Sequence, residues 1–398
     1  MNSLVKREMY LSKIRPFYDD LDTIKVITGI RRAGKSVILN QIKDEISKKT
    51  SNIIYMNFEN LLDLNKASDA LSLINYIHNL KDSNQQYYLF FDEIQLVTDW
   101  SKAIKTLRLE NNSIFITGSN SSLLSSEFQD LLSGRFVSFQ VRPFVYKEIL
   151  EYSKINNKEV SVIDYLIWGG FPKRFSLNST SELELFLTDL NDTIINHDII
   201  SRYLIKDTIL FKKVTDFVLK SNSRIVSTKS IYDYIKNEKY NCSINTIKKY
   251  IEYLKNAFII SEVEQYSSKL KRELLYYYKI YDTDVSFNSL RVANGRYDID
   301  HNLENIVYNE LIYRGYKLST YVVNNEEIDF IATENNKQYL VQVAHSVVDE
   351  KAYEREFKAF NKLDSSIQKI LITLDDIDFS TSTVRHIKFK DFLLIDKL

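Results

Sequence analysis

The sequence predicts an α/β fold with a parallel sheet in its first third, followed by helical and mixed segments. Over residues 1–150, short apolar runs that are typical of buried strands alternate with amphipathic runs that are typical of helices. The chain has 398 residues, enough for two or three domains, and its 44% apolar and 27% charged residues are the balance of a globular protein. This composition excludes a disordered chain.

The first strand of the pattern is the β-branched run 24–28, IKVIT. It leads into GIRRAGKS at 29–36, which matches GxxxxGK[ST], and then into VILNQIKDEI at 37–46, which has helical periodicity. In this context the glycines let backbone N–H groups surround phosphate oxygens, and the helix N-terminus adds the positive end of its dipole. The residues that we expect to bind a nucleotide are Gly29, Ile30, Arg31, Arg32, Ala33, Gly34, Lys35, Ser36 and Val37.

Two side chains of this loop have roles in phosphoryl transfer. Lys35 is expected to act as a catalytic residue that reaches the β- and γ-phosphates of ATP, and the Ser36 hydroxyl is expected to bind Mg²⁺. The alternative is a glycine turn before an ordinary amphipathic helix. The four constrained positions and the strand–helix context favour phosphate binding.

A second apolar strand, YYLFF at 87–91, ends in Asp92 and Glu93. If this strand lies next to the first, Asp92 is beside the metal and Glu93 beside the attacking water, which it would orient as a base. The alternative is a strand that ends in two solvated acids. Two further runs, 52–58 and 113–117, complete a parallel α/β pattern.

Two polar residues further along the chain are candidates for contact with the transferred phosphate. Asn120 follows the strand at 113–117, where a polar side chain can meet the γ-phosphate or the water, and the alternative is a simple turn. Arg135 follows Gly134 and is a catalytic candidate because its charge can stabilise the transferred phosphoryl group, in its own chain or in a second copy. The alternative for Arg135 is a surface arginine or a structural salt bridge.

The segments GIRRAGKS, YYLFFDEIQ, FITGSNSSLL and LLSGRFVSFQVRPFVYKEI, in this order, resemble the AAA-type P-loop ATPases of bacteria and archaea that carry a C-terminal restriction-endonuclease-like domain of unknown function. The similarity spans nearly the whole chain, with WGGFP at 168–172 included. The resemblance implies Mg-ATP binding and hydrolysis, with Lys35, Ser36, Asp92 and Glu93 in the roles given above. It implies no particular substrate.

We expect a parallel-sheet P-loop NTPase core of the AAA type at 1–150 and a helical lid at 151–205. A winged helix at 206–285 and a restriction-endonuclease-like α/β part at 286–398 are expected to follow.

The prediction of a winged helix rests on helical periodicity at 209–219 and 243–254 and on a basic hairpin around KLKR at 269–272. The helix at 243–254 has an apolar and a polar side, formed by Ile244, Ile247, Ile251 and Leu254 and by Asn245, Thr246, Lys248 and Lys249. Residues 206–279 carry 15 Lys/Arg against 8 Asp/Glu, which favours contact with duplex DNA. The alternative is that this part only packs other domains together.

The terminal part resembles a restriction-endonuclease-like core, in which a helix Glu, a strand Asp and an Asp/Glu-x-Lys on the next strand hold a metal. Glu304 and Asp329 fit the first two positions, but the third is occupied by Gln342 and Ala344 in place of the acid and the lysine. A nuclease without these two groups is expected to be slower by orders of magnitude. We therefore interpret this part as a degenerate scaffold that binds DNA or protein.

The function that we expect is Mg-dependent ATP binding and hydrolysis by an ATPase that works as a conformational switch on DNA. The alternatives are an ATP-regulated, metal-dependent DNA nuclease and an ATP-dependent module that binds a protein partner or a second copy of itself. One cysteine excludes a disulfide framework, and no run reaches the 18 apolar residues of a membrane span. These two features favour a cytoplasmic protein without a membrane segment.

Overall fold

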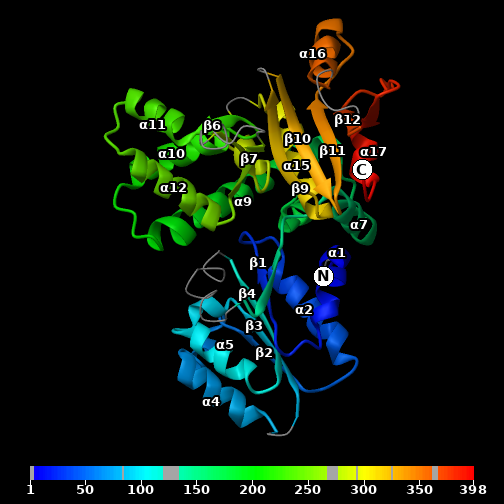
Figure 1. Cartoon of the computed structure of the whole chain (residues 1–398). Helices are drawn as coiled ribbons and strands as arrows, with labels where there is room; N and C mark the ends of the chain where they lie inside the picture. Colours follow the sequence, from blue (N-terminus) through cyan, green and yellow to red (C-terminus); the bar gives the residue numbers. More distant parts are fainter. Residues whose placement is uncertain are drawn as a thin grey trace. The chain divides into compact units, whose positions relative to one another are not determined.

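The structure is a computed structural model that describes residues 4–82, 85–119, 134–266, 277–292, 295–323, 326–360 and 366–398. The chain divides into two compact units (Figure 1). The N-terminal unit comprises Leu4–Pro143 with Asn256–Phe258, and the C-terminal unit comprises Phe144–Lys255 and Ile259–Leu398.

The N-terminal unit holds a five-stranded sheet in which all neighbouring strands are parallel. The order across the sheet is β2 (Ile53–Asn57), β3 (Tyr87–Asp92), β4 (Asn112–Gly118), β1 (Ile24–Thr28) and β5 (Phe136–Gln140). The predicted parallel α/β core is thereby confirmed. The arrangement in which the strand that ends in Asp92 and Glu93 lies next to the first strand is not observed. Strand β4 lies between β1 and β3, so that one strand separates these two acids from β1.

Helices cover both faces of this sheet, with α1 and α2 on one face and α4 and α5 on the other (Figure 1). The helical segments of the unit are α1 (Glu8–Ile14), η1 (Arg15–Phe17), α2 (Lys35–Ser47), α3 (Leu61–Lys66), α4 (Ala70–Leu80), η2 (Ile94–Leu96) and α5 (Trp100–Arg108). Alternate strand residues such as Val26, Phe91 and Ile116 pack against α4 and α5, because successive side chains of a strand point to opposite faces.

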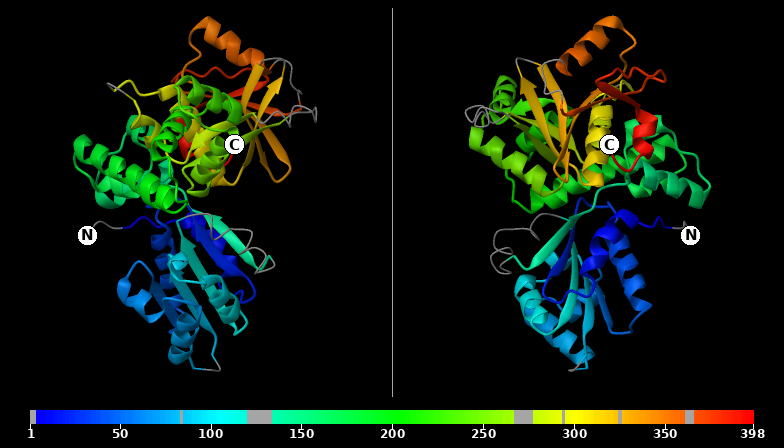
Figure 2. Two further views of the ribbon diagram at one scale, coloured as in Figure 1. Left: turned by 90° about the vertical axis from the view of Figure 1, so that its left-hand side faces the viewer. Right: turned by 45° about the vertical axis from the view of Figure 1, so that its right-hand side comes forward.

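The C-terminal unit begins with helices and continues into a mixed sheet (Figures 1 and 2). Its helical segments are α7 (Tyr146–Asn156), α8 (Val162–Trp168), η4 (Pro172–Ser176), α9 (Thr180–Thr193), the π-helix η5 (Ile194–Ser201), α10 (Thr208–Lys220), α11 (Thr228–Asn237), α12 (Ile244–Asn256), α14 (Ser286–Ser289), α15 (Ile299–Arg314), α16 (Glu350–Phe360) and α17 (Phe389–Leu394). The eight strands lie in the order β13 (Val384–Lys388), β12 (Gln368–Thr373), β11 (Lys337–Ala344), β10 (Glu326–Glu334), β9 (Lys317–Val323), β7 (Ile260–Tyr266), β8 (Tyr277–Asp282) and β6 (Ile225–Ser227).

This sheet joins two parts that we expected to be separate. Strand β7 pairs in parallel with β9, so that the three strands from the expected winged helix and the five from the expected terminal domain form one sheet. The boundary expected at 285–286 therefore lies within one compact unit. The finer division into a lid, a winged helix and a terminal domain stays a prediction.

The double glycine of WGGFP fixes the first residue of the C-terminal unit. The backbone N–H of Phe144 donates to the carbonyl of Gly170 at 2.8 Å, and the N–H of Gly170 donates to Asp284 Oδ2 at 2.7 Å. A Cβ atom on Gly170 would lie 2.0 Å from the Phe144 oxygen. Only glycine allows this approach of the two backbones.

The expected helices at 209–219 and 243–254 are present as α10 and α12, with α11 between them, and the strands on either side of the expected hairpin, β7 and β8, are antiparallel. The apolar side of α12 differs at one position, because Ile244 is exposed and Tyr250 is buried in its place. On the polar side, Asn245, Lys248 and Lys249 are exposed as expected. The basic link at 269–272 lies outside the described residues.

Candidate functional site

The loop between β1 and α2 has the backbone of a phosphate cradle. Gly29, Arg32 and Gly34 have φ angles of +136°, +66° and +100°, and the repeated left-handed turns bend the chain around a centre where backbone N–H groups can meet an anion. A Cβ atom on Gly29 would lie 2.1 Å from the carbonyl oxygen of Val141. Gly29 is therefore required by close packing as well as by its φ angle.

The lysine of the loop is held in place and faces a carboxylate. Lys35 is buried, and its Nζ donates to the carbonyl oxygens of Gly29 at 3.1 Å and Ile30 at 3.2 Å. The same Nζ lies 3.7 Å from Glu93 Oε1. The two predicted catalytic side chains are thus brought together although 58 positions separate them in the sequence (93 minus 35).

The intervening strand β4 supplies a residue that links the two acids. Thr117 is fully buried; its hydroxyl donates to Asp92 Oδ1 at 2.5 Å and accepts the backbone N–H of Glu93 at 2.9 Å. Asp92 Oδ2 also accepts the hydroxyl of Tyr55 at 3.3 Å. Burial and the Asp92 charge raise the pKa of Tyr55 to about 12, so that Tyr55 remains a neutral donor.

Glu93 has an unusual backbone for its residue type. Its φ of +54° lies in the left-handed region, directly after β3 ends. A non-glycine residue in this conformation is strained and persists because neighbouring contacts fix it. Here the contact is the bond from its N–H to Thr117, and the residue is buried, with its side chain bonded to Gln95. The carboxylate is therefore aimed toward Lys35 by the backbone.

The other predicted loop residues differ in exposure. Ser36 and Arg32 are exposed, and Val37 and Arg31 are partly exposed, with Arg31 3.7 Å from Glu59. The side chains of Ile30 and Ala33 are fully buried. These two residues therefore offer only their backbone groups to a ligand.

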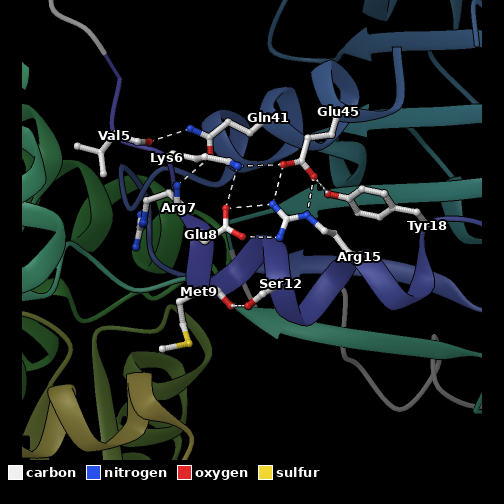
Figure 3. Close-up of polar contacts among 10 residues, drawn as sticks. All are labelled: Val5, Lys6, Arg7, Glu8, Met9, Ser12, Arg15, Tyr18, Gln41 and Glu45. Atoms are coloured by element: carbon white, nitrogen blue, oxygen red, sulfur yellow. Dashed lines mark hydrogen bonds and ion pairs between the residues drawn. The ribbon is translucent and has the colours of Figure 1, made fainter. Parts of the chain in front are cut away.

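Arg7 supports the phosphate loop through hydrogen bonds to backbone carbonyls. The fully buried guanidinium of Arg7 donates to the carbonyl oxygens of Ala33 and Arg142, both at 2.9 Å. Its backbone N–H donates to Gln41 Oε1 at 3.1 Å (Figure 3). Arg7 thus connects the phosphate loop to the segment that follows β5, and it sits 3.3 Å from where a Cβ of Gly34 would be.

Helix α1, which begins directly after Arg7, is attached to α2 by a charged network (Figure 3). Arg15 donates to both oxygens of Glu45 on α2, at 2.8 and 2.7 Å, and it is also bonded to Glu8. The hydrogen bonds from Arg15, followed by Tyr18 and other groups, lower the pKa of Glu45 to about 2. Glu8, whose pKa is likewise lowered to about 2, and Glu45 therefore stay ionised at neutral pH, and these ion pairs keep α1 attached to α2.

One predicted site residue, Arg135, is not part of this arrangement. Arg135 directly precedes β5, whose first residue pairs with Ile24 at the start of β1. It therefore lies at the amino ends of the strands, across the sheet from Gly29, and it forms an ion pair with Asp22 at 3.9 Å. This position does not support a catalytic role in its own chain. A role at the site of a second copy stays a prediction, beside the alternative of a structural salt bridge. Asn120 lies outside the described residues.

Sequence reasoning missed three residues of the site, Thr117, Tyr55 and Arg7. A threonine at the end of the apolar run 113–117 and an arginine, one of two before the first strand, are the signals that were present. Neither signal shows which carboxylate or carbonyl the side chain will contact.

Comparison with known proteins finds two domain families and two relatives that match this chain. The AAA domain family matches residues 21–150, and a domain of unknown function matches residues 159–293. An uncharacterized protein of Haemophilus influenzae is 34% identical over 380 residues, which cover 93% of this chain and 94% of the relative. An uncharacterized protein of Methanocaldococcus jannaschii is 33% identical over 91% of this chain and 84% of its own length.

The chain belongs to the same family as these two relatives, and its residues 21–150 form an AAA-type P-loop domain. A solved structure of a Walker-type ATPase of Pyrococcus abyssi is similar in fold, with a TM-score of 0.51 and 17% identity over 73% of this chain and 96% of that chain. Among the described residues, this AAA-type chain contains no helix with the length and apolar character of a membrane span.

Proposed function

We propose that this AAA-type protein binds and hydrolyses Mg-ATP, and that the bound nucleotide controls the conformation of the C-terminal unit. The observation that carries the proposal is the approach of Lys35 Nζ to Glu93 Oε1 at 3.7 Å beside a phosphate cradle. A loop that only held a nucleotide for structure would not need an acid beside its lysine.

Each group would have one task in this reaction. Backbone N–H groups of 29–36 and the Lys35 ammonium would hold the phosphates, and Ser36 with Asp92 would hold Mg²⁺, which neutralises charge on the β- and γ-phosphates. Glu93 would orient the water that attacks the γ-phosphate and would accept its proton. When ATP binds, Lys35 exchanges its contact with Glu93 for phosphate oxygens, which frees the Glu93 carboxylate for the water.

The test is steady-state ATP hydrolysis by the wild type, Lys35→Ala and Glu93→Gln. We expect Lys35→Ala to lose nucleotide binding, and Glu93→Gln to keep binding while its kcat falls by about a hundredfold or more. Undiminished turnover in Glu93→Gln would contradict the assigned role of Glu93. Absence of both binding and turnover in the wild type would contradict the proposal as a whole.

Duplex DNA is the partner that the exposed charges favour. The described part of α12 presents Asn245, Lys248 and Lys249 to solvent, and lysine contacts with phosphates make binding depend on salt. We expect fluorescence anisotropy to detect binding of a labelled duplex that weakens as salt rises, and Lys248→Glu with Lys249→Glu to remove it. If the doubly substituted protein binds the duplex as tightly as the wild type does, the DNA contact lies outside this face of α12. If the wild type does not bind the duplex, protein partners are the next candidates.

A further inference from the structure

A lysine is buried among three carboxylates in the C-terminal unit, outside the nucleotide site. Lys279 Nζ on β8 lies 2.7 Å from Glu304 Oε1 on α15, 2.7 Å from Glu327 Oε1 and 3.0 Å from Asp329 Oδ1, both on β10. The lysine side chain is 4% exposed. Two of the three acids, Glu304 and Asp329, are the residues whose pattern suggested a metal site.

The ammonium group lies within reach of all three acids. Its Nζ donates a hydrogen bond to Asp329 Oδ1 at 3.0 Å and forms ion pairs with Glu304 and Glu327, both at 2.7 Å. Burial opposes the charge, but Asp329, Glu304 and Glu327 more than compensate and raise the pKa of Lys279 well above its ordinary value. The lysine therefore carries a fixed positive charge.

Two of the acids also accept hydrogen bonds from other donors. Asp329 Oδ2 accepts the backbone N–H of Val343 at 2.9 Å, and Glu304 Oε1 accepts the hydroxyl of Tyr281 at 2.6 Å. The amide of Gln342, which stands where a further acid was expected, donates to Glu356 at 2.8 Å. Asp329 and Glu304 thus each have a second protein donor besides Lys279.

Hard divalent cations prefer carboxylate oxygens and bind them at about 2.0–2.6 Å. The oxygens around Lys279 Nζ lie at 2.7–3.0 Å, the distance of ammonium hydrogen bonds. Within the described residues, no group of three or more Asp, Glu, His or Cys side chains is arranged to hold a metal ion. The geometry of the cluster is therefore that of an ammonium site.

We propose that the Lys279 ammonium is the resident cation of the cluster formed by Glu304, Glu327 and Asp329, and that it excludes divalent metal ions from it. Lys279 on β8 forms ion pairs with acids on α15 and β10, and it therefore links these three elements of the C-terminal unit. The C-terminal unit is then a metal-free scaffold. Removal of the lysine leaves a carboxylate cluster without a cation, which a divalent ion can fill after the oxygens draw inward by roughly half an ångström.

The test measures Mn²⁺ binding by electron paramagnetic resonance in nucleotide-free, full-length protein. The variants are wild type, Asp329→Asn, Lys279→Ala and the double variant Lys279→Ala/Asp329→Asn. We expect Asp329→Asn to leave the Mn²⁺ stoichiometry of the Lys279-containing protein unchanged, and Lys279→Ala to bind one additional Mn²⁺ per chain that the double variant lacks.

Two results would overturn the proposal. One is Mn²⁺ bound by the wild type and lost in Asp329→Asn, and the other is a folded Lys279→Ala protein that binds no additional ion. Because Lys279→Ala can fail to fold without a cation, its thermal unfolding is also measured with and without millimolar Mn²⁺, against Lys279→Met. A melting temperature that rises with Mn²⁺ in either variant, and not in the wild type, supports the proposal, whereas no rise in any of them contradicts it.

Discussion

Thr117 on β4 donates its hydroxyl hydrogen to Asp92 on the neighbouring strand β3, and the two side chains are both almost completely buried. Through the same oxygen Thr117 accepts the N–H of Glu93. One hydroxyl therefore fixes the expected metal ligand and the expected water-orienting base at once. The strand that separates the two acids from the phosphate loop is also the strand that positions them.

Thr117→Val removes this hydroxyl while keeping the side-chain volume. A hydrogen bond to a buried charged group contributes about 1.5–3 kcal/mol, and each 1.4 kcal/mol lost from the transition state is about tenfold in rate. We expect kcat for ATP hydrolysis to fall by at least about tenfold while the nucleotide Kd changes little. Thr117→Ser, which keeps the hydroxyl, is the control, and equal losses in both variants would refute the role given to the hydroxyl.

Gly29→Ala tests the close contact at the start of the phosphate loop. The new Cβ would meet the Val141 carbonyl at 2.1 Å in a backbone with φ of +136°, so that Val141 or the loop must move. We expect the N-terminal unit to lose about 2–4 kcal/mol of stability. The matched control is Gly134→Ala, where φ is also positive, at +76°, but the added Cβ would meet no atom of the described residues within 4 Å. Calorimetry that finds the same melting temperature for both variants would contradict the packing argument.

Arg7→Met tests whether the N-terminal helix supports the loop. The change leaves the carbonyls of Ala33 and Arg142 without their buried donor, and each such loss costs about 1–3 kcal/mol. We expect a lower melting temperature and a nucleotide Kd that rises by roughly tenfold, measured with a fluorescent ATP analogue. Lys6→Met, one residue earlier and largely exposed, is the control and should match the wild type. A normal Kd in Arg7→Met would show that the loop holds its shape without the arginine.

The cluster around Glu304 gives the C-terminal unit a pH dependence. Burial, followed by the charge of Asp329, raises the pKa of Glu304 from 4.5 to about 8. The folded protein then holds this proton more tightly than the unfolded chain does, so that the added stability is fully present below pH 4.5 and is lost as the pH rises through about 8. Urea midpoints should fall between about pH 5 and pH 8, and fall less steeply in Glu304→Gln. Identical slopes in the two proteins would argue against a shifted pKa at Glu304.

The nucleotide loop is the part of the site that local sequence specifies. A β-branched run, glycines at 29 and 34, and a helix with apolar periodicity determine the strand, the turns and the helix through contacts between residues that are close in the chain. The same holds for the acids at the end of β3. Their chemistry and their place at a strand end both follow from a few adjacent residues.

The order of the strands was decided by packing across the sheet. The sequence contains nothing that assigns β4 rather than β3 to the side of β1, because both are short apolar runs and the neighbouring strands of this sheet are all parallel. For the same reason the sequence could not show that Thr117 contacts Asp92, or that Arg135 lies at the amino ends of the strands.

Two charged residues show most clearly what only the tertiary structure decides. No pattern in the sequence marks Arg7, which follows Lys6, or Lys279 as a buried residue, and a basic side chain is usually solvated. Each is buried here because partners from other elements compensate its charge or fill its donors, the carbonyls of Ala33 and Arg142 for Arg7 and three carboxylates for Lys279. Local sequence thus determined the phosphate loop and its strand-end acids, whereas long-range pairing determined which charges are buried, because burial of a charge depends on partners that are distant in the chain.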